Sequence, residues 1–231
     1  MRSWPSCGHR PPYPRRPRPL FALHIRYNPG MTDAKVFKRE RVKRDVREAR
    51  AESASQALAG FPRGGEWMVW TFGQFSLVDA LWALLRQTGP ADVSIATWTA
   101  AGADTTRAEQ FLAEGRIRSI RWLVDRSFET RQPEYCATLR RLFGDDVIRT
   151  TRTHAKFITV RNESWDIAVR TSMNLNHNPR LEFIEISDDP LAAAYLDGVF
   201  DEFFAGQAPG VMNGELPPVR PLAGIEAGRR S

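Results

Sequence analysis

The amino-acid sequence predicts an α/β fold in which a mixed β-sheet is flanked by helices on both faces. Short apolar runs of strand length alternate with amphipathic helical segments between residues 66 and 206, and clusters of glycine and proline separate them. The 231 residues are 42% hydrophobic and 26% charged, which suits one soluble domain with a substantial core. Strands that alternate with helices favour a sheet with helices packed on both of its faces.

Two segments precede the predicted domain. Residues 1–30 hold seven of the 16 prolines and six arginines without an acidic residue, so we expect an extended or disordered basic segment. This segment is either an arm that contacts nucleic acid or an extension upstream of a translation start at Met31. Residues 31–60 predict a charged helix that Asp33 caps and Gly60 ends. That helix is a solvated face, an oligomerisation arm or a basic contact for phosphates.

The domain is predicted at residues 66–206, and a flexible tail rich in Pro, Gly and Arg is expected over 207–231. Its first strand, 67–72, is a continuous apolar run that is typical of a buried strand. Ser76 can cap the helix that follows, which extends to about Arg86. The apolar face of this helix comprises Leu77, Ala80, Leu81, Leu84 and Leu85.

The rest of the domain continues the alternation of strands and helices. The expected order is strand 93–98, helix 106–114, strand 117–124, helix 134–142, then strands 147–149, 156–160, 167–171 and 181–186. Pro190 begins the final helix, since proline suits the first helical position. The residues of this helix that are expected to face inward are Leu191, Tyr195, Val199 and Phe203.

The chain has seven tryptophans, and most of them are expected in the core rather than at a binding surface. The exception is Trp98, which ends a predicted strand whose tip borders the candidate site. The tryptophans expected in the interior include Trp67, Trp70, Trp82 and Trp122.

The net charge of +6 and the pI near 9.8 do not describe the predicted domain. Residues 1–30 alone contribute +6, residues 31–50 contribute +4, and residues 51–231 contribute −4, with 19 basic and 23 acidic residues. The pI of the whole chain is therefore no indication that the domain binds nucleic acid.

Several protein classes do not fit this sequence. The two cysteines, Cys7 and Cys136, form neither a disulfide framework nor a zinc-binding pattern. No signal peptide and no apolar run long enough to span a membrane is recognisable. A reducing, cytoplasmic location without stable membrane association is therefore expected.

Polar residues that can act on a phosphate gather on three successive predicted strands. His154 and Lys156 lie two positions apart, so on a strand their side chains would share a face. Ser172 and Asn174 follow with the same spacing at the end of the next strand, and Glu182 lies on the third. Lys156 is the single lysine between residues 51 and 231, which contain 18 arginines. Lysine and arginine are not interchangeable at a phosphate site.

This arrangement resembles the phospholipase D superfamily, whose motif is His-x-Lys, four residues, Asp, and then Gly-Ser-x-Asn on the next strand. The corresponding segments here are His154-Ala155-Lys156 and Thr171-Ser172-Met173-Asn174. The resemblance covers about Glu66 to Phe204 and implies a phospholipase D-like half, in which a carboxylate commonly lies on a third strand.

The resemblance also implies roles for the site residues. His154 would be the nucleophile in a covalent phosphodiester cleavage, and a second histidine across the site would protonate the leaving oxygen. Lys156, Ser172 and Asn174 would bind the non-bridging oxygens. Glu182, or less favourably Glu185, would fix the imidazole tautomer. No metal or cofactor is required.

The sequence departs from the family pattern at two positions. Arg161 stands where the family has aspartate, and Asp166 lies five residues later. Thr171 replaces the glycine before the serine and adds bulk near the phosphate. Two further residues are candidate substrate contacts: Arg152 suits an exposed surface position equally well, and His177 lies in a polar segment that favours a surface turn.

The chain contains only one His-x-Lys motif. Family members with one motif pair two chains across a twofold axis, so a homodimer with an isologous interface is expected. The predicted function is a metal-independent phosphodiesterase, nuclease-like, that acts on DNA or RNA. The alternative is a catalytically degenerate domain that serves in nucleic-acid binding or assembly. A lipid-acting enzyme is less favoured, because no secretion signal or broad amphipathic helix is present.

Overall fold

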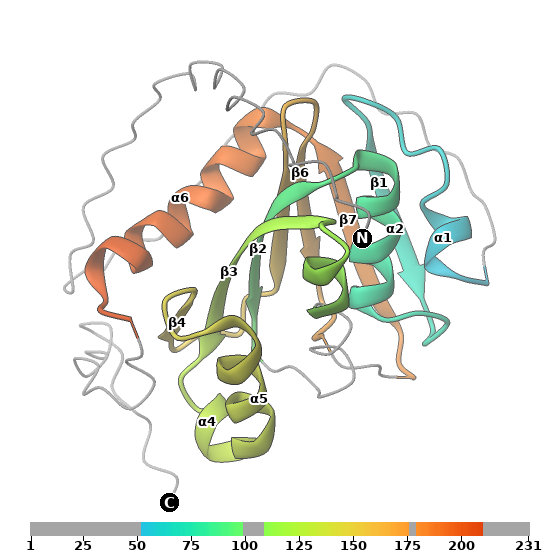
Figure 1. The fold of residues 1–231 in the computed structure, drawn as a ribbon. Coiled ribbons are helices and arrows are strands. Elements are labelled where there is room, and N and C mark those ends of the chain that lie inside the picture. Colours follow the sequence, from blue (N-terminus) through green and yellow to red (C-terminus); the bar gives the residue numbers. More distant parts are fainter. Residues whose placement is uncertain (1–51, 99–108, 176–178, 210–231) are drawn as a thin grey trace, which may run out of the picture.

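The computed structural model describes residues 52–98, 109–175 and 179–209. These residues contain a seven-stranded mixed sheet in the order β1-β7-β6-β5-β2-β3-β4 (Figure 1). The strands are β1 Glu66–Thr71, β2 Ala91–Thr97, β3 Ile117–Asp125, β4 Ile148–Thr151, β5 Phe157–Arg161, β6 Asp166–Thr171 and β7 Glu182–Asp188. The helices are α1 Ala54–Ala57, α2 Leu77–Thr88, α4 Phe128–Arg131, α5 Pro133–Phe143 and α6 Pro190–Gly206.

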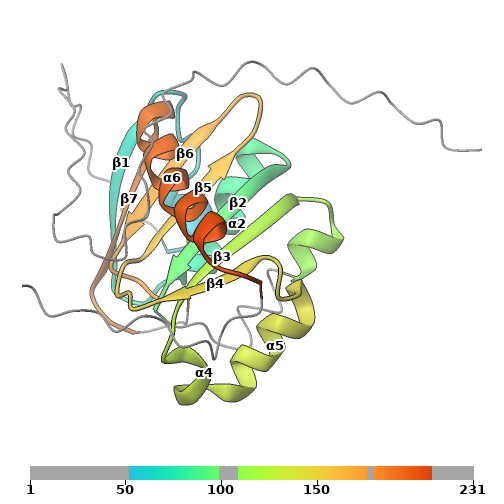
Figure 2. The ribbon, with the colours of Figure 1, turned by 90° about the vertical axis from the view of Figure 1, so that its left-hand side faces the viewer.

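Helices cover both faces of this sheet, which confirms the predicted fold class. The main core lies on the face against which α2 packs, and all five residues of the predicted apolar face of α2 are buried in it. On the opposite face α6 lies across β4, β5 and β6 (Figure 2). Two apolar layers therefore hold the sheet between them.

The ends of both long helices are specified by side chains. Ser76 caps α2, and its side chain forms a reciprocal capping box with Asp79, as the sequence predicted for the cap. Asp189 caps α6 by accepting from the backbone N–H groups of Leu191 and Ala192 at 3.0 and 3.3 Å. Pro190 takes the first helical position, again as predicted.

The first strand differs from its prediction. β1 is an edge strand that pairs only with β7, and Met68, Trp70 and Phe72 are each more than half exposed. The prediction that this run is buried, and that Trp70 belongs to the core, is therefore wrong. A continuous apolar run shows neither its position in the sheet nor which face a helix covers, and α6 does not extend over β1.

Smaller corrections concern the helices. Leu191 was expected to face inward but is 53% exposed, because α6 buries the ridge of Ala192, Ala193 and Phe200 instead. The short helix α4 was not predicted, and four residues are too few to show a period.

Some predictions lie wholly or largely outside the described residues. The segment 1–30 and the start at Met31 lie outside them, as does nearly all of the helix at 33–58. Most of the tail at 207–231 and His177 are outside them as well. Of the predicted helix at 106–114, the structure describes residues 109–113 as helical.

Candidate active site

The candidate site lies at one edge of the sheet, where strands far apart in the sequence end together. β2 runs parallel to β3 and antiparallel to β5, and the antiparallel pairing continues through β6 and β7 to β1. The carboxyl ends of β2, β3 and β6 therefore meet the amino ends of β5 and β7. Every predicted site residue lies within three residues of one of these strand ends.

His154 and Lys156 contact each other, but they do not lie on a strand as predicted. They occupy the loop that leads into β5, which begins at Phe157. Lys156 Nζ lies 3.1 Å from His154 Nδ1 and donates to the His154 carbonyl oxygen at 2.9 Å. The imidazole is exposed, whereas Lys156 is only 9% exposed. The lysine is thus fixed within the protein and the histidine faces outward.

The contact with Lys156 determines where the imidazole carries its proton. An ammonium group has only donors, so Nδ1 must accept when Lys156 is charged. The neutral ring then carries its proton on Nε2. In this state His154 can donate a hydrogen bond from Nε2, and Nε2 has no free lone pair with which to attack.

Glu182 and Ser172 form a second pair, and the charge of Glu182 acts on Lys156. The Ser172 hydroxyl donates to Glu182 Oε2 and accepts from the backbone N–H of Phe183 at 3.1 Å. Burial lowers the pKa of the Lys156 ammonium below its ordinary value, and the negative charge of Glu182 opposes this effect in part. The pair His154 and Lys156 and the pair Ser172 and Glu182 therefore influence each other through charge.

The position of Glu182 differs from the role that the resemblance implies for a carboxylate. Among the described residues, its carboxylate accepts from the Ser172 hydroxyl and acts on Lys156 through its charge, and Nδ1 of His154 faces Lys156 instead. Glu185, the weaker candidate, accepts from Arg170 at 2.9 Å on the other side of β7.

Asn174 is close in sequence to this group but has no contact with it in the described part of the chain. Its Oδ1 is buried and lacks a hydrogen-bond partner there. An unpaired buried amide oxygen costs free energy, so it marks a place where a further group can be bound.

Asp125 positions the loop that carries His154, and the sequence analysis missed it. Its Oδ2 accepts from the backbone N–H of Thr153 at 2.9 Å, and Oδ1 accepts from both the backbone and the hydroxyl of Ser127. Burial alone raises the pKa of Asp125, but these hydrogen bonds and the charge of Arg131 outweigh it and hold the pKa below its usual value. The signal was its position, directly after a predicted strand.

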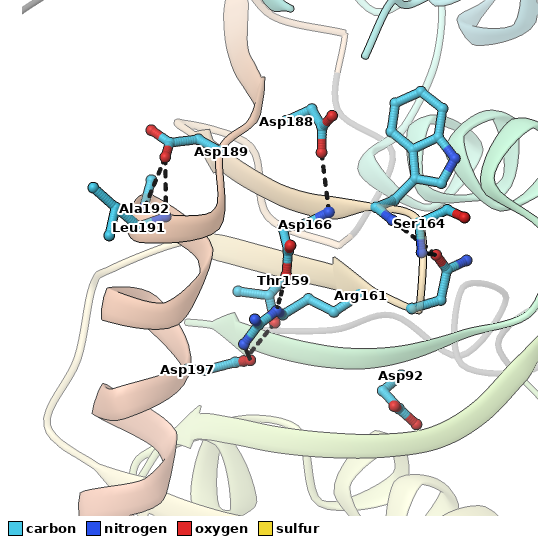
Figure 3. Close-up of polar contacts among 12 residues, drawn as sticks. Asp92, Thr159, Arg161, Ser164, Asp166, Asp188, Asp189, Leu191, Ala192 and Asp197 are labelled. Carbon is cyan, nitrogen blue, oxygen red and sulfur yellow. Dashed lines mark hydrogen bonds and ion pairs between the residues drawn. The ribbon is translucent and has the colours of Figure 1, made fainter. Parts of the chain in front are cut away.

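Arg161, at the position where the resemblance implies an aspartate, belongs to an ion-pair network away from the imidazole. It donates to Asp166 Oδ1 at 2.7 Å and to Asp197 Oδ2 at 2.9 Å (Figure 3). Asp197 lies on α6 and also accepts from Thr159 at 2.7 Å and from Arg121 at 3.0 Å. Arg161 therefore joins β5, β6 and α6, and its charge is balanced by the carboxylates of Asp166 and Asp197.

Thr171, the other departure, uses its hydroxyl within the protein. The hydroxyl donates to the carbonyl oxygen of Phe183 at 2.6 Å and accepts from the backbone N–H of Met173 at 3.0 Å. These bonds fix the turn after β6, where Ser172 lies. Arg152 is exposed beside the His154 loop.

The described residues contain no helix long and apolar enough to cross a membrane. No family model matches the chain, and no curated protein matches it in sequence.

Solved structures do show similarity. NucT from Helicobacter pylori is 13% identical, with a TM-score of 0.44 over 63% of this chain and 99% of that one. Nuc from Salmonella typhimurium, a phospholipase D family member, is 14% identical, with a TM-score of 0.44 over 63% of this chain and 97% of that one. Polyphosphate kinase from Porphyromonas gingivalis is 14% identical, with a TM-score of 0.47 over 68% of this chain and 29% of that one.

Proposed function

We propose that the chain is a metal-independent phosphodiesterase of the phospholipase D-like type, nuclease-like, with one active site shared by two copies. The observation that carries this proposal is the pairing of an exposed His154 with a buried Lys156, which Glu182 and Ser172 join at one sheet edge. A reactive ring faces solvent while the charge that would bind phosphate is held beside it.

The reaction would proceed in two displacements. An imidazole nitrogen attacks phosphorus and forms a P–N bond as the P–O bond to the leaving group breaks. The leaving oxygen takes a proton from a second imidazole, which begins the reaction as imidazolium and becomes neutral. Water then attacks phosphorus, gives its proton to that second imidazole and releases the first. Lys156 and the Ser172 hydroxyl stabilise the charge on the non-bridging oxygens.

Neither of these two roles is compatible with the contact between Lys156 and Nδ1. To protonate the leaving oxygen, the ring must be an imidazolium with a proton on each nitrogen, so Lys156 turns away from Nδ1. For the role of nucleophile, Lys156 turns from Nδ1 to the phosphate and the ring proton moves to Nδ1, which frees the Nε2 lone pair. A symmetric dimer would supply two copies of His154, one in each state.

Cleavage in the presence of EDTA tests this function. We expect the wild-type protein to cut labelled DNA or RNA oligonucleotides in EDTA, and His154→Ala to lose activity by about 10³-fold or more. His24→Ala makes the same chemical change outside the domain and should retain activity. Since His154 is exposed, the circular dichroism spectrum and melting temperature of His154→Ala should match the wild type. A wild-type protein that binds nucleic acid but cleaves no diester would contradict the proposal.

A second candidate function is nucleic-acid binding or assembly by a catalytically degenerate domain. Arg161 in place of aspartate and Thr171 in place of glycine favour it, because both side chains are engaged in structural bonds. In that case His154→Ala would leave nucleic-acid affinity and biological activity intact, and no diester would be cleaved.

A further inference from the structure

An arginine and a tryptophan extend the site beyond His154. Trp98 lies directly after β2, and the centroid of its indole ring is 5.5 Å from that of the His154 imidazole. The guanidinium carbon of Arg131 lies 3.8 Å from the indole centroid, and Nη2 donates to the Trp98 carbonyl oxygen at 3.3 Å. A guanidinium over an aromatic face is held there by a cation–π interaction. Arg131 and His154 are therefore both positioned against the same Trp98 ring.

The positive charge of Arg131 is only weakly balanced. Its ion pair with Asp125 spans 3.9 Å, and that carboxylate already accepts bonds from Ser127 and Thr153. By contrast, Arg161 lies 2.7 and 2.9 Å from its two carboxylates. A long, partly exposed ion pair neutralises little charge, so the guanidinium remains able to bind an anion.

Other arginines lie at the same edge of the sheet. Arg126 follows β3, and its backbone N–H donates to the Thr151 carbonyl oxygen at 2.9 Å. Arg152 follows β4 and is exposed. The chain thus places three arginines after the strands next to the His154 loop, although residues 51–231 carry a net charge of −4. Such a local concentration of positive charge favours a ligand with more than one phosphate.

We propose that Arg131, held by Trp98, binds the phosphate next to the one that His154 and Lys156 engage. This inference rests on the proposed function and narrows its substrate to a chain of at least two phosphodiesters. A nucleic acid repeats the diester along its backbone, whereas a phospholipid such as phosphatidylglycerol offers one per molecule. Arg131 and His154 both lie against the Trp98 ring, so the ring is engaged within the protein rather than in stacking on a base. Recognition in this proposal therefore comes from phosphates, and binding tolerates different nucleotide sequences.

The length of the ligand tests this subsite. Binding of labelled oligothymidylates with one, two and three diesters is measured by fluorescence anisotropy in the His154→Ala background, which prevents turnover. We expect affinity to rise about tenfold between one and two diesters, as one charge-assisted arginine–phosphate contact provides. Adding Arg131→Ala should remove this gain and reduce the slope of log K against log[salt] by about one. Arg131→Lys should keep the charge and part of the gain.

Arg116 offers a matched control. Its guanidinium carbon lies 5.6 Å from the centroid of the Trp82 ring, so it is also an arginine paired with a tryptophan, and it precedes β3 at the opposite end of that strand. Arg116→Ala should leave the length dependence and the salt slope unchanged. Equal losses in Arg116→Ala and Arg131→Ala, or equal affinity for one and two diesters, would overturn the inference.

Trp98 is a positioning residue in this proposal. Trp98→Phe keeps an aromatic face and should retain most of the gain from the second diester, whereas Trp98→Ala should lose it. If Trp98→Phe and Trp98→Ala show the same gain in affinity from the second diester, the aromatic ring does not position Arg131.

Two further measurements separate this inference from the proposed function. Bis(p-nitrophenyl) phosphate has one diester, so Arg131→Ala should lose far more kcat/KM on oligonucleotides than on this compound; equal losses would reject the subsite and leave the function standing. If no diester is cleaved, the function fails, and the binding series still decides the subsite. Phosphatidylglycerol vesicles that displace the two-diester ligand as well as unlabelled oligonucleotide would overturn the choice of nucleic acid.

Discussion

Lys156 is the residue on which the candidate chemistry depends most. It is the one lysine between residues 51 and 231, it is buried, and it contacts both the ring and the carbonyl of His154. A buried ammonium is stabilised by a nearby negative charge, which Glu182 provides. In the proposed site, Glu182 would therefore influence phosphate binding without touching the phosphate itself.

The pH dependence of activity tests this influence. Phosphate binding needs the charged ammonium, so kcat/KM should fall as the pH rises through the pKa of Lys156, below the usual lysine value of about 10.4. Because the charge of Glu182 raises this pKa, Glu182→Gln should lower it further and move the alkaline limb to lower pH. The substituted amide still offers an oxygen to the Ser172 hydroxyl.

The control for this profile is Glu185→Gln, three residues further along β7. Glu185 pairs with Arg170 on the other side of the strand, so its loss should leave the alkaline limb in place. If the alkaline fall of kcat/KM shifts equally in both variants, or does not shift in Glu182→Gln, then Glu182 does not set the charge state of Lys156.

The sequence predicted the site residues that carry a recognisable spacing and missed those that act through the fold. Of the predicted candidates, the structure places His154 in contact with Lys156 and Ser172 in contact with Glu182, and it leaves Asn174 Oδ1 without a hydrogen-bond partner in the described residues. Asp125 and Arg131 were missed because their importance arises from contacts with Thr153 and Trp98, which are distant in the chain. Such contacts depend on strand order, and one sequence does not determine strand order.

At the scale of elements, Arg161 helps to attach α6 to the sheet through its ion pair with Asp197. Asp197 accepts bonds from Arg161 and Arg121, and also from Thr159 and Ser94. Three strands and one helix therefore meet at a single carboxylate. The sequence analysis noted Arg161 but could not identify its partner, since Asp197 lies 36 residues further along.

Removal of Asp197 should destabilise the domain. Asp197→Ala leaves two guanidinium groups without this carboxylate, and breaking a largely buried ion pair costs about 3 kcal/mol or more. Urea unfolding followed by circular dichroism should show this as a lower midpoint. Asp201→Ala is the matched control, because Asp201 also pairs with Arg121 but is 63% exposed. It should cost well under 1 kcal/mol, as exposed pairs do. Equal losses in the two variants would contradict the central place of Asp197.

Prediction of the elements succeeded where amphipathic periods were long and failed at the margins of the sheet. The buried face of α2 was correct at every position, because a twelve-residue helix shows its period clearly. For β1 the same apolar composition was misread as buried, although Met68, Trp70 and Phe72 are exposed. Edge and central strands differ in what covers them, and the local sequence does not encode that cover.

At the scale of the whole molecule, one chain provides half of the proposed chemistry. The two displacements need a nucleophile and a proton donor, and the described part of the chain contains one histidine, His154. That ring is exposed, so a second copy can approach it. A twofold axis close to His154 would place two identical half-sites on one phosphate, as an isologous dimer requires.

Mixing experiments test this shared site. Mass photometry should show dimers at working concentration, and a strict monomer would contradict the proposal. Wild-type and His154→Ala chains, mixed in equal amounts and allowed to exchange, form wild-type dimers in only about a quarter of cases under random pairing. If both histidines are needed, activity should fall to that fraction of the value for wild type at the same total concentration. Chains that act independently would retain half, and an equal mixture with His24→Ala should retain all of it. A mixture with His154→Ala that keeps half of the activity would therefore place a complete site within one chain.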